Sequence, residues 1–238
     1  MIEFDRVSKT YGDITALDSF SLKVPTAKIT VLMGLSGSGK TTAIRMVNKM
    51  AIPTSGSVSI DGLDVADRDA VALRRTVGYV MQEVGLLPHK TVIDNVTLIA
   101  RIAGQTAEDA QSNAAEMLTM VGIDEQSFGR YPQQLSGGQQ QRVGVARALA
   151  IKPNILLMDE PFGAVDPIVR EELQDELSRI QRELGLTIMF VTHDRHEALK
   201  IADQLVVLSN GGHIEQAGAP SELTAKPANE FVRKILGV

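Results

Sequence analysis

Gly34-Leu35-Ser36-Gly37-Ser38-Gly39-Lys40-Thr41 is the stretch that decides the fold class of this 238-residue chain. It fits the pattern G-x-x-x-x-G-K-[ST] and stands between an apolar run, residues 29–33, and a helical pattern that begins near Thr41. In that context the backbone N–H groups and the helix N-terminus attract phosphate oxygens. Lys40 is expected to bridge the β- and γ-phosphates of a nucleotide, and the Thr41 hydroxyl to reach Mg²⁺. A glycine-rich turn that binds nothing is the alternative, which the flanking strand and helix disfavour.

Two kinds of strand are expected around this loop. Residues 29–33, 155–158, 188–191 and 205–208 are continuously apolar, and each of the first three precedes a loop and a helical pattern, as in parallel strands covered on both faces. Residues 2–7, 20–24 and 57–60 also indicate short strands, and the first two alternate apolar with polar residues, which predicts a half-buried antiparallel sheet. The predicted fold class is therefore α/β: a P-loop NTPase core of mixed parallel sheet, an N-terminal antiparallel β subdomain and an inserted helical subdomain.

A single domain, residues 1–238, is expected, with a core at 1–82 and 147–238 and the helical insertion at 83–146. Within the insertion, Thr106 and Asp109 resemble a capping box, and Ala114, Met117, Leu118 and Val121 follow at helical spacing. A second amphipathic helix is predicted after Asp166 and Pro167, ending at Gly185, with an apolar stripe that faces the core. Its members are Leu173, Leu177, Ile180 and Leu184.

Composition excludes several classes of protein. The net charge is -5 and Lys and Arg are scattered, which argues against a nucleic-acid partner. The chain has no Cys, which excludes disulfides and thiolate metal sites and permits a reducing cytoplasm. Residues 1–5 show no basic stretch before an apolar one, so no secretory signal is expected. The apolar runs are too short to span a bilayer, so any association with a membrane is expected to be peripheral, from the aqueous side.

Two acids follow the strand expected at residues 155–158. Asp159 comes directly after it and should project from the carboxyl end of the sheet, where it could hold the Mg²⁺ that Thr41 also approaches. Glu160 comes next, and a second acid in a metal-phosphate pocket is costly unless it has a role. We assign it to polarising the attacking water as general base. Considered alone, the two would more often be a solvated acidic pair.

Leu135-Ser136-Gly137-Gly138-Gln139-Gln140-Gln141-Arg142 precedes a helical run that reaches residue 150. Its Ser and two Gly residues present a hydroxyl and free N–H groups to an anion, although a nonspecific turn before a helix is the alternative. With this stretch the sequence resembles the ABC ATPase family, whose signature is Leu-Ser-Gly-Gly-Gln. The resemblance covers essentially the whole chain, and its motifs occur in the family order.

The resemblance implies an ATPase that uses ATP and Mg²⁺, with roles for individual residues. Tyr11 matches an aromatic residue that stacks on adenine, Gln82 matches the Gln that links the nucleotide site to the helical subdomain, and His193 matches a His that contacts the γ-phosphate. Ala164-Val165-Asp166 fits a loop that crosses the dimer. The implied catalytic residues are Glu160, His193 and Gln82; the metal residues are Thr41, Gln82 and Asp159. The implied nucleotide contacts are Tyr11, Gly34, Ser36, Gly37, Ser38, Gly39, Lys40, Thr41, Thr42, Ser136, Gly137, Gly138, Gln139 and Asp166.

Partners follow from the same resemblance. Family members form head-to-tail dimers, which implies that Ser136 and Gly138 of one subunit close over ATP bound to Lys40 of the other. Transmembrane permease subunits are expected at residues 82–89, and an extracytoplasmic substrate-binding protein indirectly. The implied location is cytoplasmic, peripheral on the inner face of the cell membrane.

Residues 77–89, 130–132 and 158–167 look like those of osmoprotectant importers for glycine betaine, choline or carnitine. These loops face the permease, so import of an amino acid or other small polar solute stays open. A soluble cassette acting on DNA or ribosomes is disfavoured because no long coiled-coil insertion or second cassette is present, and intact Glu160 and His193 oppose a regulator without turnover. Many members of the subgroup continue into C-terminal regulatory modules, whereas this sequence stops at Val238, either because that part is naturally missing or because it was removed.

Overall fold

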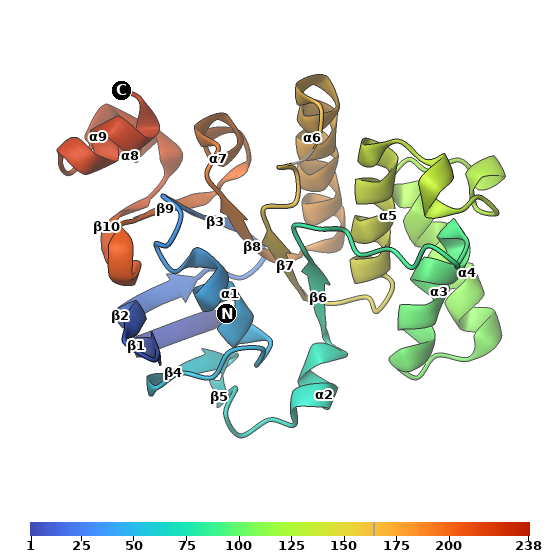
Figure 1. The fold of residues 1–238 in the computed structure, drawn as a ribbon, viewed down its shortest axis with the longest axis horizontal. Coiled ribbons are helices and arrows are strands. Elements are labelled where there is room, and N and C mark those ends of the chain that lie inside the picture. Colours follow the sequence, from blue (N-terminus) through green and yellow to red (C-terminus); the bar gives the residue numbers. More distant parts are fainter. Residues whose placement is uncertain (164) are drawn as a thin grey trace.

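The computed structural model describes residues 1–163 and 165–238, and two sheets form its frame (Figure 1). The larger sheet has the strand order β10-β9-β3-β8-β7-β6, in which all pairs are parallel except that of β10 with β9. The smaller sheet is antiparallel, in the order β2-β1-β4-β5. This arrangement confirms the predicted α/β class, with its mixed sheet and separate N-terminal antiparallel sheet.

The strands of the larger sheet are β3 (Ile29–Gly34), β6 (Val77–Val80), β7 (Ile155–Asp159), β8 (Thr187–Thr192), β9 (Gln204–Leu208) and β10 (Ile214–Gly218). The smaller sheet contains β1 (Ile2–Tyr11), β2 (Ile14–Val24), β4 (Ser55–Ile60) and β5 (Leu63–Asp64). The helices are α1 (Lys40–Val47), α2 (Ala70–Arg74), α3 (Val92–Ile102), α4 (Ala107–Met120), α5 (Gly137–Leu149), α6 (Pro167–Leu184), α7 (Arg195–Ile201), α8 (Pro220–Ala225) and α9 (Glu230–Leu236).

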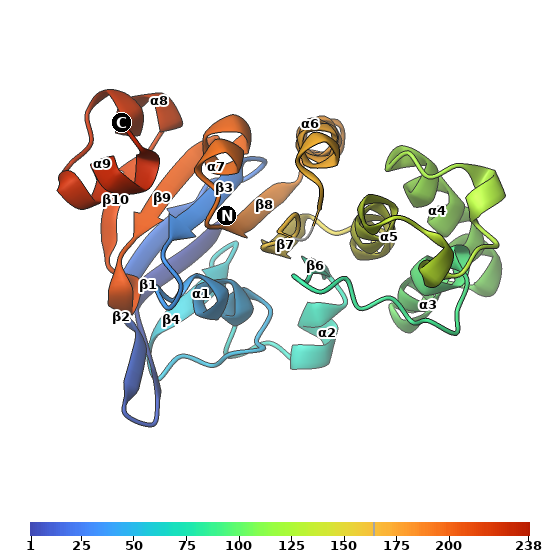
Figure 2. The ribbon, with the colours of Figure 1, turned by 45° about the horizontal axis from the view of Figure 1, so that its top comes forward.

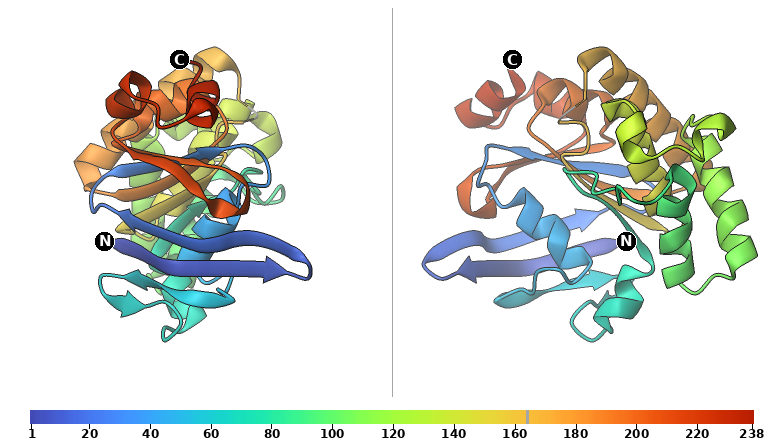
Figure 3. Two further views of the ribbon diagram at one scale, coloured as in Figure 1. Left: turned by 90° about the vertical axis from the view of Figure 1, so that its left-hand side faces the viewer. Right: turned by 45° about the vertical axis from the view of Figure 1, so that its right-hand side comes forward.

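Both faces of the parallel sheet are covered, as the apolar runs predict. Leu32 of β3 packs in a core that includes the antiparallel sheet and the buried face of α1, whereas its neighbours Val31 and Met33 pack in a second core with α5 and α6. Figure 3 shows α1 between the two sheets, and Figure 2 shows α3, α4 and α5 gathered beyond β6. The phosphate-binding segment is therefore anchored at the centre of the molecule.

Local sequence accounts for the helix ends. Thr106 accepts a hydrogen bond from the Asp109 N–H at the start of α4, and Asp166 accepts one from the Ile168 N–H at the start of α6. Gly185 ends α6 in the left-handed region at φ 63°. The predicted stripe is buried at Leu173, Leu177 and Ile180. Helix α5 runs through residue 146, so the predicted boundary between insertion and core falls inside a continuous helix.

Two features differ from the sequence-based expectation. Strand β6 is not predicted, because Gly78 and Tyr79 interrupt its short apolar run. The hairpin of β1 and β2 extends beyond the expected strands, because its outer residues are exposed and carry no alternating pattern. Helix α1 begins at Lys40, near Thr41 as expected. Among the described residues, no helix is both long and apolar enough to cross a membrane.

Candidate functional site

Strand order decides which loops meet. Strands β3, β8 and β7 are neighbours in the sheet and run parallel, so their carboxyl ends lie side by side. The loop after β3 contains Lys40, His193 follows β8, and Glu160 follows β7. The fold thereby gathers residues from three distant parts of the sequence at one edge, where open α/β sheets bind ligands.

Lys40 occupies the centre of the phosphate-binding loop. Its side chain is buried, and Nζ donates hydrogen bonds to the carbonyl oxygens of Gly34 and Leu35, both at 2.8 Å, and to Ser38 Oγ at 3.2 Å. Gly39 precedes it at φ 87°, where a Cβ would also lie 2.4 Å from the Ala16 carbonyl oxygen. The loop is thus wrapped tightly around a single ammonium group.

The charge environment of Lys40 favours an added anion. Burial lowers the pKa of its ammonium group below the usual value, while the nearby carboxylates of Glu160 and Asp159 act in the opposite direction. A phosphate group beside Nζ would supply further negative charge and offset the cost of burying the cation.

Asp159 lies beside Thr41 as the sequence predicts. The Thr41 hydroxyl donates a 2.8 Å hydrogen bond to Asp159 Oδ1, and the carboxylate is only 5% exposed. The Tyr79 hydroxyl lies 3.4 Å from Oδ2, and Arg45 Nη2 lies 3.8 Å from the same oxygen. Sequence reasoning missed Tyr79 and Arg45, because neither belongs to a recognised motif and only the pairing of β6 with β7 brings Tyr79 close.

These groups fit Mg²⁺. Within residues 1–163 and 165–238 no cluster of three or more His, Cys, Asp or Glu side chains forms a complete metal cage. Mg²⁺ in nucleotide sites, however, is typically held by one or two oxygen side chains together with phosphates and water. A buried carboxylate hydrogen-bonded to a hydroxyl, at the edge of a phosphate loop, has the required oxygen chemistry.

Glu160 and His193 form the other side of the site. His193 Nδ1 lies 3.1 Å from Glu160 Oε2, and the Glu160 N–H donates to the Val191 carbonyl oxygen at 3.0 Å. Glu160 has φ 47°, a left-handed conformation that costs free energy for a residue with a side chain. The carboxylate is therefore held by the surrounding strands in a position that its backbone does not prefer.

Two adjoining cavities contain most of the predicted residues. A cavity of about 570 Å³ is lined by Met33, Gly34, Leu35, Ser36, Gln82, Glu160, His193 and Ile235. Another of about 280 Å³ is lined by Tyr11, Ile14, Ala16, Ser36, Gly37, Gly39, Lys40, Thr41, Thr42 and Glu160. Ser36 and Glu160 line both. The two cavities together lead from the half-exposed Tyr11 ring, past the phosphate-binding loop, to His193.

The signature segment lies elsewhere. Ser136 and Gln139 form a capping box at the start of α5, in which Ser136 Oγ accepts from the Gln139 N–H at 3.3 Å and Gln139 Oε1 from the Ser136 N–H at 3.0 Å. Ser136 and Gly137 are exposed, while Gly138 packs against Val169. None of the four predicted residues 136–139 lines either cavity, and neither does Asp166. Ala164 lies outside the described residues.

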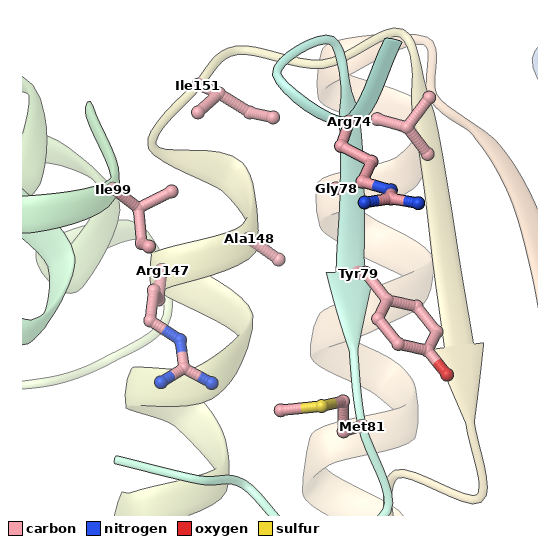
Figure 4. Close-up of a pocket in the computed structure, with 9 residues that line it drawn as sticks. Arg74, Gly78, Tyr79, Met81, Ile99, Arg147, Ala148 and Ile151 are labelled. Atoms are coloured by element: carbon pink, nitrogen blue, oxygen red, sulfur yellow. The ribbon is translucent and has the colours of Figure 1, made fainter. Parts of the chain in front are cut away.

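A groove separates β6 from the helices beyond it (Figure 4). Its volume is about 310 Å³, and Arg147 of α5 stands at its edge, donating to the Gly85 carbonyl oxygen at 2.7 Å and to the Val84 carbonyl oxygen. Burial lowers the pKa of Arg147. The lining is otherwise largely apolar: Arg74, Val77, Gly78, Tyr79, Met81, Ile99, Ala148 and Ile151 complete it.

Comparisons with known proteins place this geometry in context. The family model described as ABC transporter matches residues 17–163. The chain is 44% identical over 238 residues to the carnitine transport ATP-binding protein OpuCA of Listeria monocytogenes, covering 100% of this chain and 60% of that protein. It is 46% identical over 243 residues to the osmoprotectant import ATP-binding protein OsmV of Salmonella typhimurium, covering 100% and 63%.

A third relative, the glycine betaine uptake system ATP-binding protein YehX of Escherichia coli, is 43% identical over 237 residues, covering 100% of this chain and 77% of that protein. Among solved structures, the dimeric bacterial ABC transporter cassette MJ0796 has a TM-score of 0.83 and 35% identity, covering 92% of this chain and 99% of that one. A post-hydrolysis dimer of the same cassette, bound to ADP and Pi, has a TM-score of 0.83 and 34% identity, covering 92% and 99%. The chain thus spans about three fifths of the length of the first two relatives.

Proposed function

Because the chain belongs to the ABC transporter family, we propose that it is the ATP-hydrolysing subunit of an importer of quaternary ammonium osmoprotectants such as glycine betaine, choline or carnitine. The observation that carries the ATPase proposal is the pair of adjoining cavities, which place Lys40, Glu160 and His193 along one path. ATP is the substrate, with its adenine at Tyr11 and its phosphates at residues 34–42.

Binding of the phosphates falls to the loop and the start of α1. The Lys40 ammonium exchanges its carbonyl partners for phosphate oxygens, and the N–H groups of the loop and helix supply positive potential. Thr41 and Asp159 would hold Mg²⁺, with Gln82 from the adjoining cavity as a further ligand, and the ion would neutralise phosphate charge. Asp159 is suited to this because its carboxylate is buried beside the Thr41 hydroxyl, and its one ion-pair partner among the described residues, Arg45, is 3.8 Å away.

Hydrolysis needs a base and a donor at the terminal phosphate. Glu160 accepts the proton of the attacking water, and its carboxylate is oriented by the 3.1 Å contact with His193. His193, whose side chain is 65% exposed, is free to turn toward the γ-phosphate and stabilise the charge that develops there. Gln82, at the wall of the same cavity, positions the water.

A second copy completes the site. The exposed N-terminus of α5, with Ser136 and Gly137, binds anions but lines neither cavity of its own chain. Both similar cassette structures are dimeric, which supports a head-to-tail homodimer in which residues 136–139 and Asp166 close over the partner's ATP. ATP then joins the two copies, and hydrolysis removes the shared ligand.

The permease contact is proposed at the groove of Figure 4. An apolar cleft edged by Arg74 and Arg147 suits an amphipathic helix, and Arg147 holds the backbone of the segment 82–89 beside it. We propose a division into a core, 1–82 and 147–238, and a helical part, 83–146; the groove supports a separation of β6 from the helices, although the boundary at residue 146 lies within α5. The subunit would then lie on the cytoplasmic face of the membrane, and the permease would receive solute from an extracytoplasmic binding protein.

The substrate class rests on the relatives. The three relatives are ATP-binding proteins for carnitine transport, osmoprotectant import and glycine betaine uptake, and each matches over the whole of this chain. Since the solute itself is bound by other subunits, the cassette is assigned by lineage and not by a solute pocket of its own.

Glu160→Gln tests the ATPase proposal. Loss of the general base should lower kcat by about 10²- to 10⁴-fold while ATP binding persists, so ATP should trap a dimer on size-exclusion chromatography. Glu108→Gln, an exposed acid in the first turn of α4, is the matched control and should behave as the original chain. A Glu160→Gln protein that stays monomeric with ATP and hydrolyses it normally would refute the assignment.

Reconstitution with the partner permease and binding protein in liposomes tests the substrate class. Glycine betaine, choline or carnitine should accelerate ATP turnover and accumulate inside, whereas an amino acid without a quaternary ammonium group, such as glutamine, should do neither. Acceleration by the amino acid alone would replace the quaternary ammonium assignment with the alternative solute class.

A further inference from the structure

Three side-chain pairs join α6 to α7. Arg170 Nη1 lies 2.9 Å from Asp194 Oδ2, and Lys200 Nζ lies 2.8 Å from Asp175 Oδ1. Between these ion pairs, Gln174 Nε2 donates to Glu197 Oε1 at 3.4 Å. Helix α6 starts directly after Asp166, and α7 starts at Arg195, two residues after His193, so these pairs connect the two loops that lead into the helices.

Arg170 differs from the other residues of these three pairs because it also contacts the loop before α6. Its Nη2 donates a 3.1 Å hydrogen bond to the Val165 carbonyl oxygen, while Nη1 holds Asp194. A single planar guanidinium therefore bridges the backbone next to Asp166 and the carboxylate next to His193. Because the guanidinium is planar and rigid, its two hydrogen-bonding nitrogens fix the spacing between the two loops.

The two oxygens of Asp194 have separate partners. Oδ1 accepts from the backbone N–H groups of His196 and Glu197 and so caps α7, whereas Oδ2 faces Arg170. Burial acts to raise the pKa of Asp194, but the hydrogen bonds from Glu197 and His196, together with Arg170, lower it below the usual value. Asp194 is thus ionised at neutral pH and serves the helix cap and the bridge at the same time.

We propose that Arg170 is a positioning residue that couples the Val165 and Asp166 loop to His193. The inference rests on the proposed function, in which that loop meets the second copy. When the loop is displaced in the dimer, the Val165 carbonyl moves and Arg170 moves with it. Asp194, which is bound to Arg170, then shifts the backbone of the adjacent His193. His193 is 3.1 Å from Glu160, so the bridge transmits a displacement of the loop on dimer formation to the base.

A purely structural tie between α6 and α7 is the alternative reading of the same contacts. The Lys200–Asp175 and Gln174–Glu197 pairs, together with the buried Leu173 and Ala198, hold the two helices together independently of Arg170. Removing the guanidinium should therefore leave the helices packed and change mainly the loops.

Asp194→Asn tests the bridge with little effect on the fold. The Asn oxygen can retain the cap, since Asn is as good a cap as Asp, but its amide group would point N–H donors at Arg170 in place of Oδ2. Arg170→Lys keeps a positive charge and loses the fork, and Arg182→Ala, an exposed arginine of the same helix, is the matched control. Thermal unfolding of each variant confirms that it is folded.

Steady-state ATPase kinetics of the full chain give the decisive readout. Both bridge variants should lower kcat by about ten- to hundredfold with KM for ATP changed less than about twofold, because the loops are misplaced and the nucleotide contacts are intact. In a Glu160→Gln background, ATP-dependent dimers should persist. The double variant Arg170→Lys, Asp194→Asn should lose no more than the single variants, since both break one interaction.

Unchanged kcat in Asp194→Asn, additive losses in the double variant, or an equal loss in Arg182→Ala would each overturn the coupling role. A fall in ATP-dependent dimerisation would do so as well, because it would place Arg170 in assembly. An original chain without ATPase activity would instead overturn the proposed function, so the two failures are distinguishable.

Discussion

Replacing Lys40 by Met removes the ammonium group from the phosphate-binding loop and keeps an apolar side chain of similar length. In the structure all three ammonium protons have partners, two carbonyl oxygens and one hydroxyl. ATP binding exchanges such neutral acceptors for phosphate oxygens, and each hydrogen bond between charged groups contributes about 1.5–3 kcal/mol. When the three existing hydrogen bonds of the ammonium group are subtracted, we expect a net loss of about 2–3 kcal/mol of ATP binding free energy, which raises the Kd for ATP about 30- to 150-fold.

Isothermal titration with Mg-ATP measures this loss, and Lys49→Met is the matched control. Lys49 lies just beyond the same helix, and its Nζ also donates to two carbonyl oxygens, those of Ala66 and Arg68, at 2.7 and 2.8 Å. It lines neither nucleotide cavity, so its replacement should leave the Kd unchanged. An unchanged ATP affinity in Lys40→Met, or an equal loss in both variants, would refute the role of the Lys40 charge.

Two further predictions concern the metal and a buried acid. Thr41→Val removes the hydroxyl that contacts Asp159 and should abolish most of the difference in ATP affinity between titrations with Mg²⁺ and with EDTA; a full Mg²⁺ dependence would contradict the metal assignment. Burial raises the pKa of Glu197, so its contribution to stability is full below the unfolded pKa and is lost as pH rises through the folded value. In urea unfolding, Glu197→Gln should therefore gain stability relative to the original chain as pH rises above the ordinary pKa of a glutamate, and a difference independent of pH would exclude this cause.

Much of the fold follows from apolar patterning. The continuous runs around β3, β7, β8 and β9 predict strands because each is buried on both faces, and their carboxyl ends indicate where the loops meet. Strand β6 escapes prediction for a physical reason. Its Gly78 lies so close to α5 that a Cβ would be 2.8 Å from the Ala148 carbonyl oxygen, so tertiary packing selects a residue that lowers strand propensity.

The candidate site was predictable where one motif contains the whole interaction. Lys40 and Thr41 belong to the phosphate-binding pattern, and Asp159 follows directly from its place after an apolar strand. Tyr79 and Arg170 were not predictable, because their partners lie 80 and 24 residues away in the sequence and become neighbours only through strand pairing and helix packing. Residues that act through another side chain carry no local signal of their own.

The left-handed backbone conformation of Glu160 positions the general base but lowers the stability of the fold. At φ 47° a glycine would be relaxed, whereas the glutamate adds a cost of about 1–3 kcal/mol that the neighbouring strands must cover. Directed evolution for thermal stability alone, without selection for turnover, should therefore favour glycine at this position and yield proteins that are more stable but inactive. Mutagenesis aimed at thermal stability should therefore leave Glu160 unchanged.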